Sequence, residues 1–168
     1  MTGVTIRPAD LPDAGRIGEI YDEAIAAGDA TFAVGPHPES ERRGWLAGRA
    51  ATAPVFVAET DGAILGWSAV APFSHRSWFS GVGEYTVYVA ETARGHGVGS
   101  CLLADLILKA PAFGYWKLVG LIFPENVAGL ALARSAGFAD VGVFRDHGRL
   151  GGTWRDISIV ERHLEQAT

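Results

Sequence analysis

The sequence predicts one α/β domain in which helices cover both faces of a central mixed sheet. The 168 residues match the usual size of a single domain, so residues 1–168 are expected to form one unit. With 48% hydrophobic and 20% charged residues, the chain can bury a core. Segments with strand and helix spacing follow one another in the order β-α-α-β-β-β-α-β-α-β-β, which is typical of a layered α/β fold.

The first part of the chain predicts a strand and two helices. Residues 4–7 form a short apolar strand, and Asp10 can cap the helix that follows. The apolar positions of this helix share one face: Ile17, Ile20, Tyr21, Ala24 and Ile25. Gly28 is a plausible stop for it. Residues 29–38 are loop-like, and residues 39–51 predict a second helix.

Six strands and two helices are expected after residue 54. The Asp61-Gly62 pair is a specific hairpin signal between the first two of these strands. A helix follows the glycines after residue 95, and Gly137 ends the other helix. The predicted strands are 55–59, 64–72, 83–90, 118–123, 138–144 and 153–161, and the helices lie within 95–109 and 126–136.

Composition limits the possible functions. The net charge of -5 and the pI near 5.5 argue against a protein that binds nucleic acid by neutralising phosphates. The single Cys101 excludes an internal disulfide, and the five histidines lack metal-ligand spacing, so no metal is expected. The N-terminus lacks the pattern of a signal peptide and no apolar run could span a bilayer, so we expect a soluble cytoplasmic protein that does not bind membranes.

The sharpest motif is a glycine-rich turn between a strand and a helix. It reads Arg94-Gly95-His96-Gly97-Val98-Gly99-Ser100. Glycines let the backbone approach a ligand, and the unpaired N–H groups of the helix start favour phosphate oxygens. A P-loop would require Gly-Lys-Ser or Gly-Lys-Thr, and a dinucleotide fingerprint would require glycine at Ser100. A turn that binds no ligand remains the alternative.

The remaining pattern, with Arg94, Gly97 and Gly99 at the Arg/Gln-x-x-Gly-x-Gly/Ala positions, resembles the pyrophosphate-binding motif of GNAT acetyltransferases. The order of elements is similar to that family over the whole chain. The resemblance implies a GNAT fold, a twisted, mostly antiparallel sheet of about seven strands, with acetyl-CoA as co-substrate. The later segment with Asn126, Leu132, Gly137 and Phe138 is also similar, which implies that Asn126 contacts the cofactor. Asn126 is equally suited to cap its helix.

Within the family, the chain resembles the phosphinothricin and methionine sulfoximine N-acetyltransferase branch. The strings that carry this likeness are Ile6-Arg7-Pro8-Ala9-Asp10, Thr31-Phe32, Glu84-Tyr85-Thr86-Val87-Tyr88-Val89 and Gly152-Thr153-Trp154-Arg155-Asp156. The resemblance implies an amine substrate with an amino-acid-like head and a polar or anionic tail. It also implies a homodimer.

The resemblance makes Glu84 the candidate general base, because only an unprotonated amine attacks a thioester. Strand alternation places Glu84, Thr86 and Tyr88 on one face and Tyr85, Val87 and Val89 on the other. Tyr85 and Thr86 are included in the predicted substrate site. A salt-bridged strand carboxylate is the alternative for Glu84.

Arg76 stands where this branch carries an arginine that would hold an anionic group of the substrate. Phe32 and Phe79 are candidate walls of the same pocket, although each could be ordinary core. Two departures from the family stand out: Ala133 occupies the place of a Tyr or His acid, and Ser74 that of a lysine. Protonation of the leaving thiolate is therefore left to water, to Tyr88 or to another group, and phosphinothricin itself becomes doubtful as the substrate.

The expected mechanism is direct transfer in a ternary complex. The turn Gly95–Ser100 would bind the pyrophosphate, and the Val87 and Val89 backbones would pair with pantetheine. A backbone N–H of that strand would polarise the thioester carbonyl, and Glu84 would accept the amine proton. Two alternatives stay open: an acetyltransferase that acts on protein N-termini or lysines, and a regulatory module that binds acyl-CoA without turnover.

Overall fold

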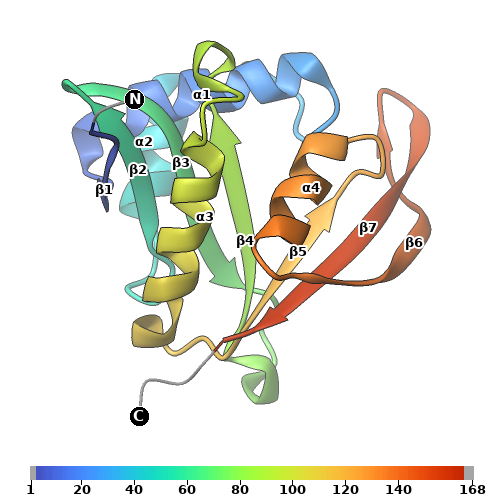
Figure 1. The fold of residues 1–168 in the computed structure, drawn as a ribbon. Coiled ribbons are helices and arrows are strands. Elements are labelled where there is room, and N and C mark those ends of the chain that lie inside the picture. Colours follow the sequence, from blue (N-terminus) through green and yellow to red (C-terminus); the bar gives the residue numbers. More distant parts are fainter. Residues whose placement is uncertain (1–2, 165–168) are drawn as a thin grey trace.

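A computed structural model of the chain describes residues 3–164 and shows one twisted seven-stranded sheet (Figure 1). The strands are β1 (Thr5–Pro8), β2 (Val55–Thr60), β3 (Ala63–Pro72), β4 (Val82–Val89), β5 (Lys117–Ile122), β6 (Ala139–Leu150) and β7 (Thr153–His163). The α-helices are α1 (Ala14–Ala27), α2 (Glu39–Ala47), α3 (Val98–Lys109) and α4 (Val127–Ser135). The mixed sheet and the order of elements confirm the predicted fold class.

The strands are arranged β1-β2-β3-β4-β5-β7-β6, and each neighbouring pair is antiparallel except β4 with β5. The hairpin between β2 and β3 turns at Asp61 and Gly62, as predicted, with both residues at positive φ. A parallel pair needs a crossover connection, and α3 supplies it between β4 and β5.

Two hydrophobic clusters hold the sheet between its helices. Helices α1 and α2 cover one face, where Ile17 and Ile20 pack with Val57 and Trp67. Helices α3 and α4 lie against the other face (Figure 1), where their residues Leu103, Leu106, Leu130 and Ala133 form a core with Tyr85 of β4. The side chains of residues 84 to 89 of β4 therefore point alternately toward the face covered by α1 and α2 and the face covered by α3 and α4. Within residues 3–164, no helix combines the length and apolar character required to cross a bilayer.

Both N-terminal helices differ from the prediction at one end. A 3-10 turn (Leu11–Asp13) precedes α1, with Asp10 as its N-cap, and the Asp13 carboxylate accepts a hydrogen bond from the backbone N–H of Asp10 at 2.8 Å. Helix α2 ends at Ala47 instead of residue 51. Arg49 lies beyond this end and donates to the carbonyls of Ala53 and Val70, at 2.8 and 2.6 Å, and these bonds favour an irregular segment over another helical turn. The stop of α1 at Gly28, with φ of 72°, is as predicted.

Strand β6 runs to Leu150, although the sequence predicts its end at Phe144. The added part follows a register shift between Phe144 and Gly148 and pairs with the first residues of β7. Its sequence, Arg145-Asp146-His147-Gly148-Arg149, has no apolar alternation. Strand β6 is therefore extended by its pairing with β7 and not by a pattern in its own sequence.

Candidate active site

Strands β4 and β5 separate within the sheet and leave part of β4 unpaired. The two strands pair only from Val82 to Glu84, whereas β3 accompanies β4 as far as Val89. Val82 O accepts from Phe73 N at 2.9 Å and Ala90 N donates to Leu65 O at 2.8 Å. The N–H and C=O groups of the even-numbered residues in this segment therefore point toward β3. Since peptide groups alternate along a strand, Val87 and Val89 turn their N–H and C=O groups toward the gap.

The glycine-rich turn lies at the end of this unpaired segment. Gly95 and Gly97 adopt φ of 74° and 83°, which is the left-handed region that favours glycine. Gly97 is the N-cap of α3 and no side chain caps this helix. The N–H groups of Val98, Gly99 and Ser100 therefore have no intrahelical acceptor, and they lie at the positive end of the helix dipole.

A cavity of about 470 Å³, here called the α3 cavity, joins this turn to the unpaired edge of β4. Its lining includes ten residues of the predicted cofactor site: Val87, Tyr88, Val89, Arg94, Gly95, Gly97, Val98, Gly99, Ser100 and Asn126. His96 is exposed and lies outside this lining. The lining also contains residues that sequence reasoning missed, namely Ala24, Asp29, Ala30, Ala93, Ala128, Gly129 and Leu132. Gly129 and Leu132 belong to the segment that contains Asn126, so the motif could have indicated them.

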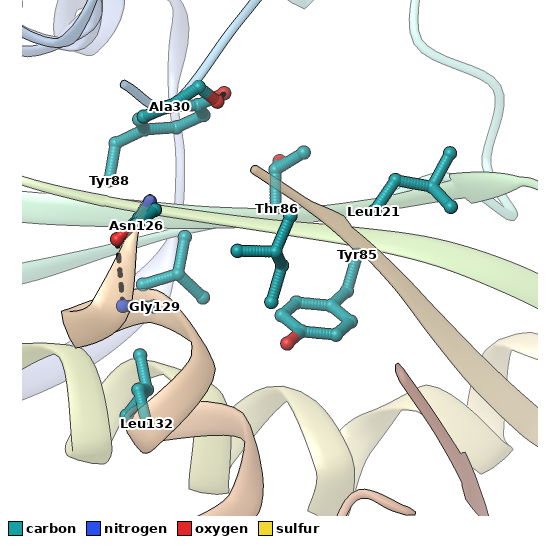
Figure 2. A pocket seen from close by; sticks show the side chains of 10 residues that line it. Ala30, Tyr85, Thr86, Tyr88, Leu121, Asn126, Gly129 and Leu132 are labelled. Atoms are coloured by element: carbon teal, nitrogen blue, oxygen red, sulfur yellow. Dashed lines mark hydrogen bonds between the residues drawn. The ribbon is translucent and has the colours of Figure 1, made fainter. Parts of the chain in front are cut away.

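A smaller cavity of about 70 Å³, the gap cavity, lies between the separating strands (Figure 2). Asn126 caps α4 here, since its side-chain oxygen accepts from Gly129 N at 2.8 Å. The predicted capping role of Asn126 is therefore present, and the same residue lines both cavities. Figure 2 shows Tyr85 and Tyr88 on opposite sides of β4, in agreement with the predicted alternation.

A third cavity of about 240 Å³, the Glu84 cavity, lies between the sheet and helices α1 and α2. It is lined by Tyr21, Arg42, Trp45, Arg49, Trp67, Ala69, Ala71, Glu84, Thr86 and Tyr88. Burial raises the pKa of the Glu84 carboxyl above its ordinary value. Within the described range, no hydrogen bond or ion pair engages this carboxylate, which contradicts the salt-bridged alternative.

Two residues of β4 are shared by the linings of these cavities. Thr86 lines the gap cavity and the Glu84 cavity, and Tyr88 lines all three. Burial strongly raises the pKa of the Tyr88 hydroxyl, which therefore stays protonated near neutral pH. The arrangement thus places a phosphate-compatible helix start, an edge of β4 that no strand covers and a desolvated carboxylate around adjacent cavities.

The other predicted substrate residues occupy different places. Arg76 and Phe79 are exposed in the segment between β3 and β4, outside the linings of these three cavities. Phe32 packs edge-on against Phe123, with ring centroids 4.7 Å apart. Tyr85 is buried against Phe138 on the α3 side and also lines the gap cavity. The substrate roles of these four residues stay predictions.

Sequence reasoning did not find the residues that α1 and α2 bring to the Glu84 cavity, because no local motif marks Tyr21, Arg42 or Arg49. Ala133, where relatives carry an acid, is completely buried in the core. Within residues 3–164, no group of three or more His, Cys, Asp or Glu side chains could hold a metal ion.

The model of the acetyltransferase (GNAT) family matches residues 18–138. This chain belongs to the GNAT acetyltransferase family. Among curated proteins, the L-methionine sulfoximine/L-methionine sulfone acetyltransferase of Pseudomonas paraeruginosa is 31% identical over 163 residues, which cover 96% of this chain and 95% of the relative.

Solved GNAT structures share the whole fold. A phosphinothricin acetyltransferase from Sinorhizobium meliloti, crystallised with acetyl-CoA, is 30% identical with a TM-score of 0.89, and the match covers 98% of this chain and 89% of that one. A ribosomal-protein-alanine N-acetyltransferase from Brucella melitensis is 34% identical with a TM-score of 0.91, covering 95% and 99%. The names of these relatives point to different kinds of amine, so similarity alone does not identify the acceptor of this GNAT protein.

Proposed function

We propose that this chain transfers the acetyl group of acetyl-CoA to the primary amine of a small amino-acid-like molecule. The observation that carries this proposal is the position of Glu84. This carboxylate is desolvated and lacks a partner in the described range, and it faces a cavity that shares Thr86 and Tyr88 with the gap beside the glycine-rich turn. An acceptor and a donor can thus meet from two sides of β4.

The residues of the α3 cavity fit acetyl-CoA. The N–H groups of Val98, Gly99 and Ser100, with Arg94 beside them, would hold the pyrophosphate. The Val87 and Val89 peptide groups would pair with the amides of the pantetheine arm, as a neighbouring strand would. A Cβ built on Gly95 or Gly97 meets no atom within 4 Å, so these positions leave open space for a ligand. Acetyl-CoA supplies a thioester, an activated acetyl group.

Glu84 would take the proton that the amine loses. A carboxylate with a raised pKa is a stronger base than an exposed one, which suits proton removal near neutral pH. The reaction forms a nitrogen–carbon bond and breaks the carbon–sulfur bond, and CoA leaves as the thiol. Direct transfer is preferred because Cys101 is exposed and lies outside the three cavity linings.

A second acceptor class is a protein N-terminus, and the 34% identity to the ribosomal-protein-alanine enzyme favours it. The size of the Glu84 cavity argues for a small molecule. Its 240 Å³ are walled by the aromatic rings of Tyr21, Trp45 and Trp67, and this size suits a single amino acid.

A thiol-release assay tests the proposal. The protein is mixed with acetyl-CoA and, in separate reactions, with L-methionine sulfoximine, L-methionine sulfone, phosphinothricin and an Ala-initiated hexapeptide. We expect thiol release with at least one of the amino-acid-like amines and little with the peptide. Release with the peptide alone would establish the second acceptor class. Acetyl-CoA binding without release in any reaction would favour a regulatory module.

A further inference from the structure

The side chain of Arg42 reaches the Glu84 cavity by packing closely against Gly18 of α1. A Cβ built on Gly18 would lie 2.9 Å from the Cγ of Arg42, too close for a real contact. The absence of a side chain at Gly18 therefore lets the aliphatic part of Arg42 pack directly on the surface of α1. Beyond this contact, the guanidinium lies over the ring of Tyr21, with Cζ 4.3 Å from the ring centroid. The side chain is thus held by packing before any ligand binds.

The guanidinium of Arg42 lacks acceptors. Its Nε and Nη2 atoms are buried without a hydrogen-bond partner, and none of the described residues forms an ion pair with it. Two other arginines of the described residues show the contrast. Arg49 donates to two carbonyls, and Arg134 holds both oxygens of Asp140 through Nε and Nη2 at 3.0 and 3.1 Å. The same two atoms of Arg42, Nε and Nη2, have no carboxylate to bind. Buried charged donors are costly without acceptors, so this group is suited to a ligand that brings one.

The charges that line the Glu84 cavity suit an amino acid. Two guanidinium groups, Arg42 and Arg49, and one carboxylate, Glu84, line the same 240 Å³. Arg42 and Glu84 do not pair with each other, since no ion pair within 4.0 Å joins them among the described residues. The cavity therefore offers an acceptor for an ammonium group and an unpaired donor for a carboxylate, and these two groups share one carbon atom in an α-amino acid.

We propose that Arg42 binds the α-carboxylate of the acceptor while Glu84 takes the proton of its α-amine, so that Arg42 of α2 is the residue that selects acceptors with a carboxylate next to the amine. A planar guanidinium binds a carboxylate bidentately and so fixes the orientation of the amine next to it. This inference rests on the proposed function and adds the group that selects the acceptor.

The test compares two acceptors that differ by one group. L-methionine sulfone carries the α-carboxylate, and 3-(methylsulfonyl)propylamine is the same molecule without it. In Arg42→Met the unbranched stem still passes Gly18, but the donors are gone. We expect kcat/KM for the sulfone to fall roughly ten- to a hundred-fold and that for the amine to change less than about threefold. Dividing each mutant value by the wild-type value for the same acceptor cancels the different amine pKa values.

Arg43→Met is the matched control, since Arg43 is the neighbouring residue of α2 and is exposed. It should leave both values unchanged. Gly18→Ala is a second variant that keeps Arg42 but moves its stem, and it should also lower only the value for the sulfone. The melting temperature and the shift that acetyl-CoA produces in it report whether each variant folds and binds the donor.

Equal losses for both acceptors in Arg42→Met, or no loss for either, would overturn the inference while the proposed function stands. A wild-type protein that releases thiol with neither of these acceptors, and with neither L-methionine sulfoximine nor phosphinothricin, would instead contradict the proposed function, and the inference with it.

Discussion

Tyr21 of α1 and Tyr88 of β4 meet edge to face, with ring centroids 5.0 Å apart. Tyr21 is held by Thr31, whose hydroxyl lies 2.8 Å from its own. Tyr88 lines all three cavities, so this pair forms the wall between the α3 cavity and the Glu84 cavity. The wall separates the space proposed for the donor from the space proposed for the acceptor.

This wall predicts different results for two substitutions of Tyr88. Tyr88→Phe keeps the ring and loses only a hydroxyl that lies 3.5 Å from Ala30 O, so kcat should stay within about threefold of wild type. Tyr88→Ala opens the wall and should raise the KM of both acetyl-CoA and the amine. Steady-state kinetics with both substrates varied measures this. A large fall of kcat in Tyr88→Phe would instead assign the hydroxyl a chemical role, such as protonation of the leaving thiolate.

An acidic residue at the start of α3 should separate folding from cofactor binding. Ser100→Glu places a negative charge at the positive end of the helix dipole, which should leave stability unchanged or raise it by about 0.3–1 kcal/mol. The same charge repels phosphates, so the rise in melting temperature with acetyl-CoA should disappear. Ala104→Glu adds the same charge at an exposed position one turn later and serves as control. If Ser100→Glu kept the full shift, the phosphates would bind elsewhere.

The local parts of this site could be predicted from sequence, because they depend on short segments. The left-handed glycines of the turn, the capping Asn126 and the alternation of Glu84 and Tyr85 follow from residue type and spacing. The approach of Arg42 to Tyr21 across Gly18 could not, since it depends on how α1 packs on α2. The separation of β4 from β5 is likewise a property of the sheet and of no single segment.

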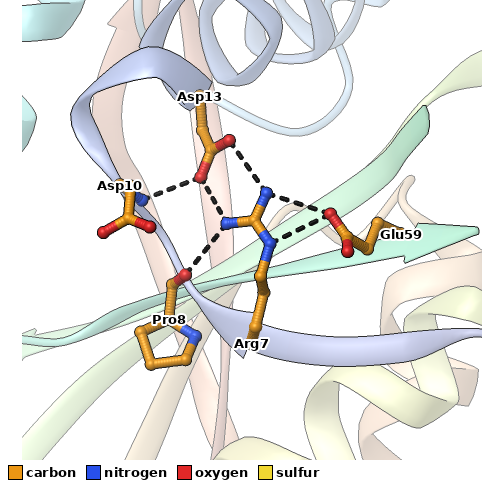
Figure 3. Close-up of polar contacts among 5 residues, drawn as sticks. All are labelled: Arg7, Pro8, Asp10, Asp13 and Glu59. Atoms are coloured by element: carbon orange, nitrogen blue, oxygen red, sulfur yellow. Dashed lines mark hydrogen bonds and ion pairs between the residues drawn. The ribbon is translucent and has the colours of Figure 1, made fainter. Parts of the chain in front are cut away.

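Arg7 joins three segments at the edge of the sheet (Figure 3). It holds both oxygens of Asp13 at 2.7 and 3.0 Å, and its Nε donates to Glu59 at 2.9 Å. Arg7→Met should lower the free energy of unfolding at pH 7 by about 1–2 kcal/mol, because it leaves the mostly buried Asp13 carboxylate without its two guanidinium donors. Urea denaturation measures this. The exposed Arg134–Asp140 pair is the control, and Arg134→Met should change little.

The effect of Arg7→Met should depend on pH in a defined direction. The hydrogen bond from Arg7 holds the pKa of Asp13 below its ordinary value of 3.8, so its contribution is complete above that value. It is lost as the pH falls through the lowered pKa. The difference between wild type and Arg7→Met should therefore shrink in strong acid, and a difference that grew there would contradict this account.

Glu84 predicts the opposite dependence. Its pKa is raised by burial, so the folded protein holds this proton more tightly than the unfolded chain. Stability is therefore lost as the pH rises from the ordinary value of 4.5 through the raised pKa. Glu84→Gln removes the buried charge and should be more stable than wild type at pH 8, with the two proteins converging near pH 4. A variant less stable than wild type at pH 8 would mean that the carboxylate has a stabilising partner.

The central claim is that Glu84 accepts the proton of the amine, and the pH profile of kcat/KM in wild type and Glu84→Gln tests it most directly. Glutamine keeps the size of the side chain but cannot take the proton. With L-methionine sulfone, the variant should lose roughly a hundred-fold or more at neutral pH, the scale of general base catalysis. The loss should shrink as the pH approaches the pKa of the amine, where solvent supplies the free base, and acetyl-CoA binding should not change. Wild-type rates in Glu84→Gln at pH 7 would contradict the claim.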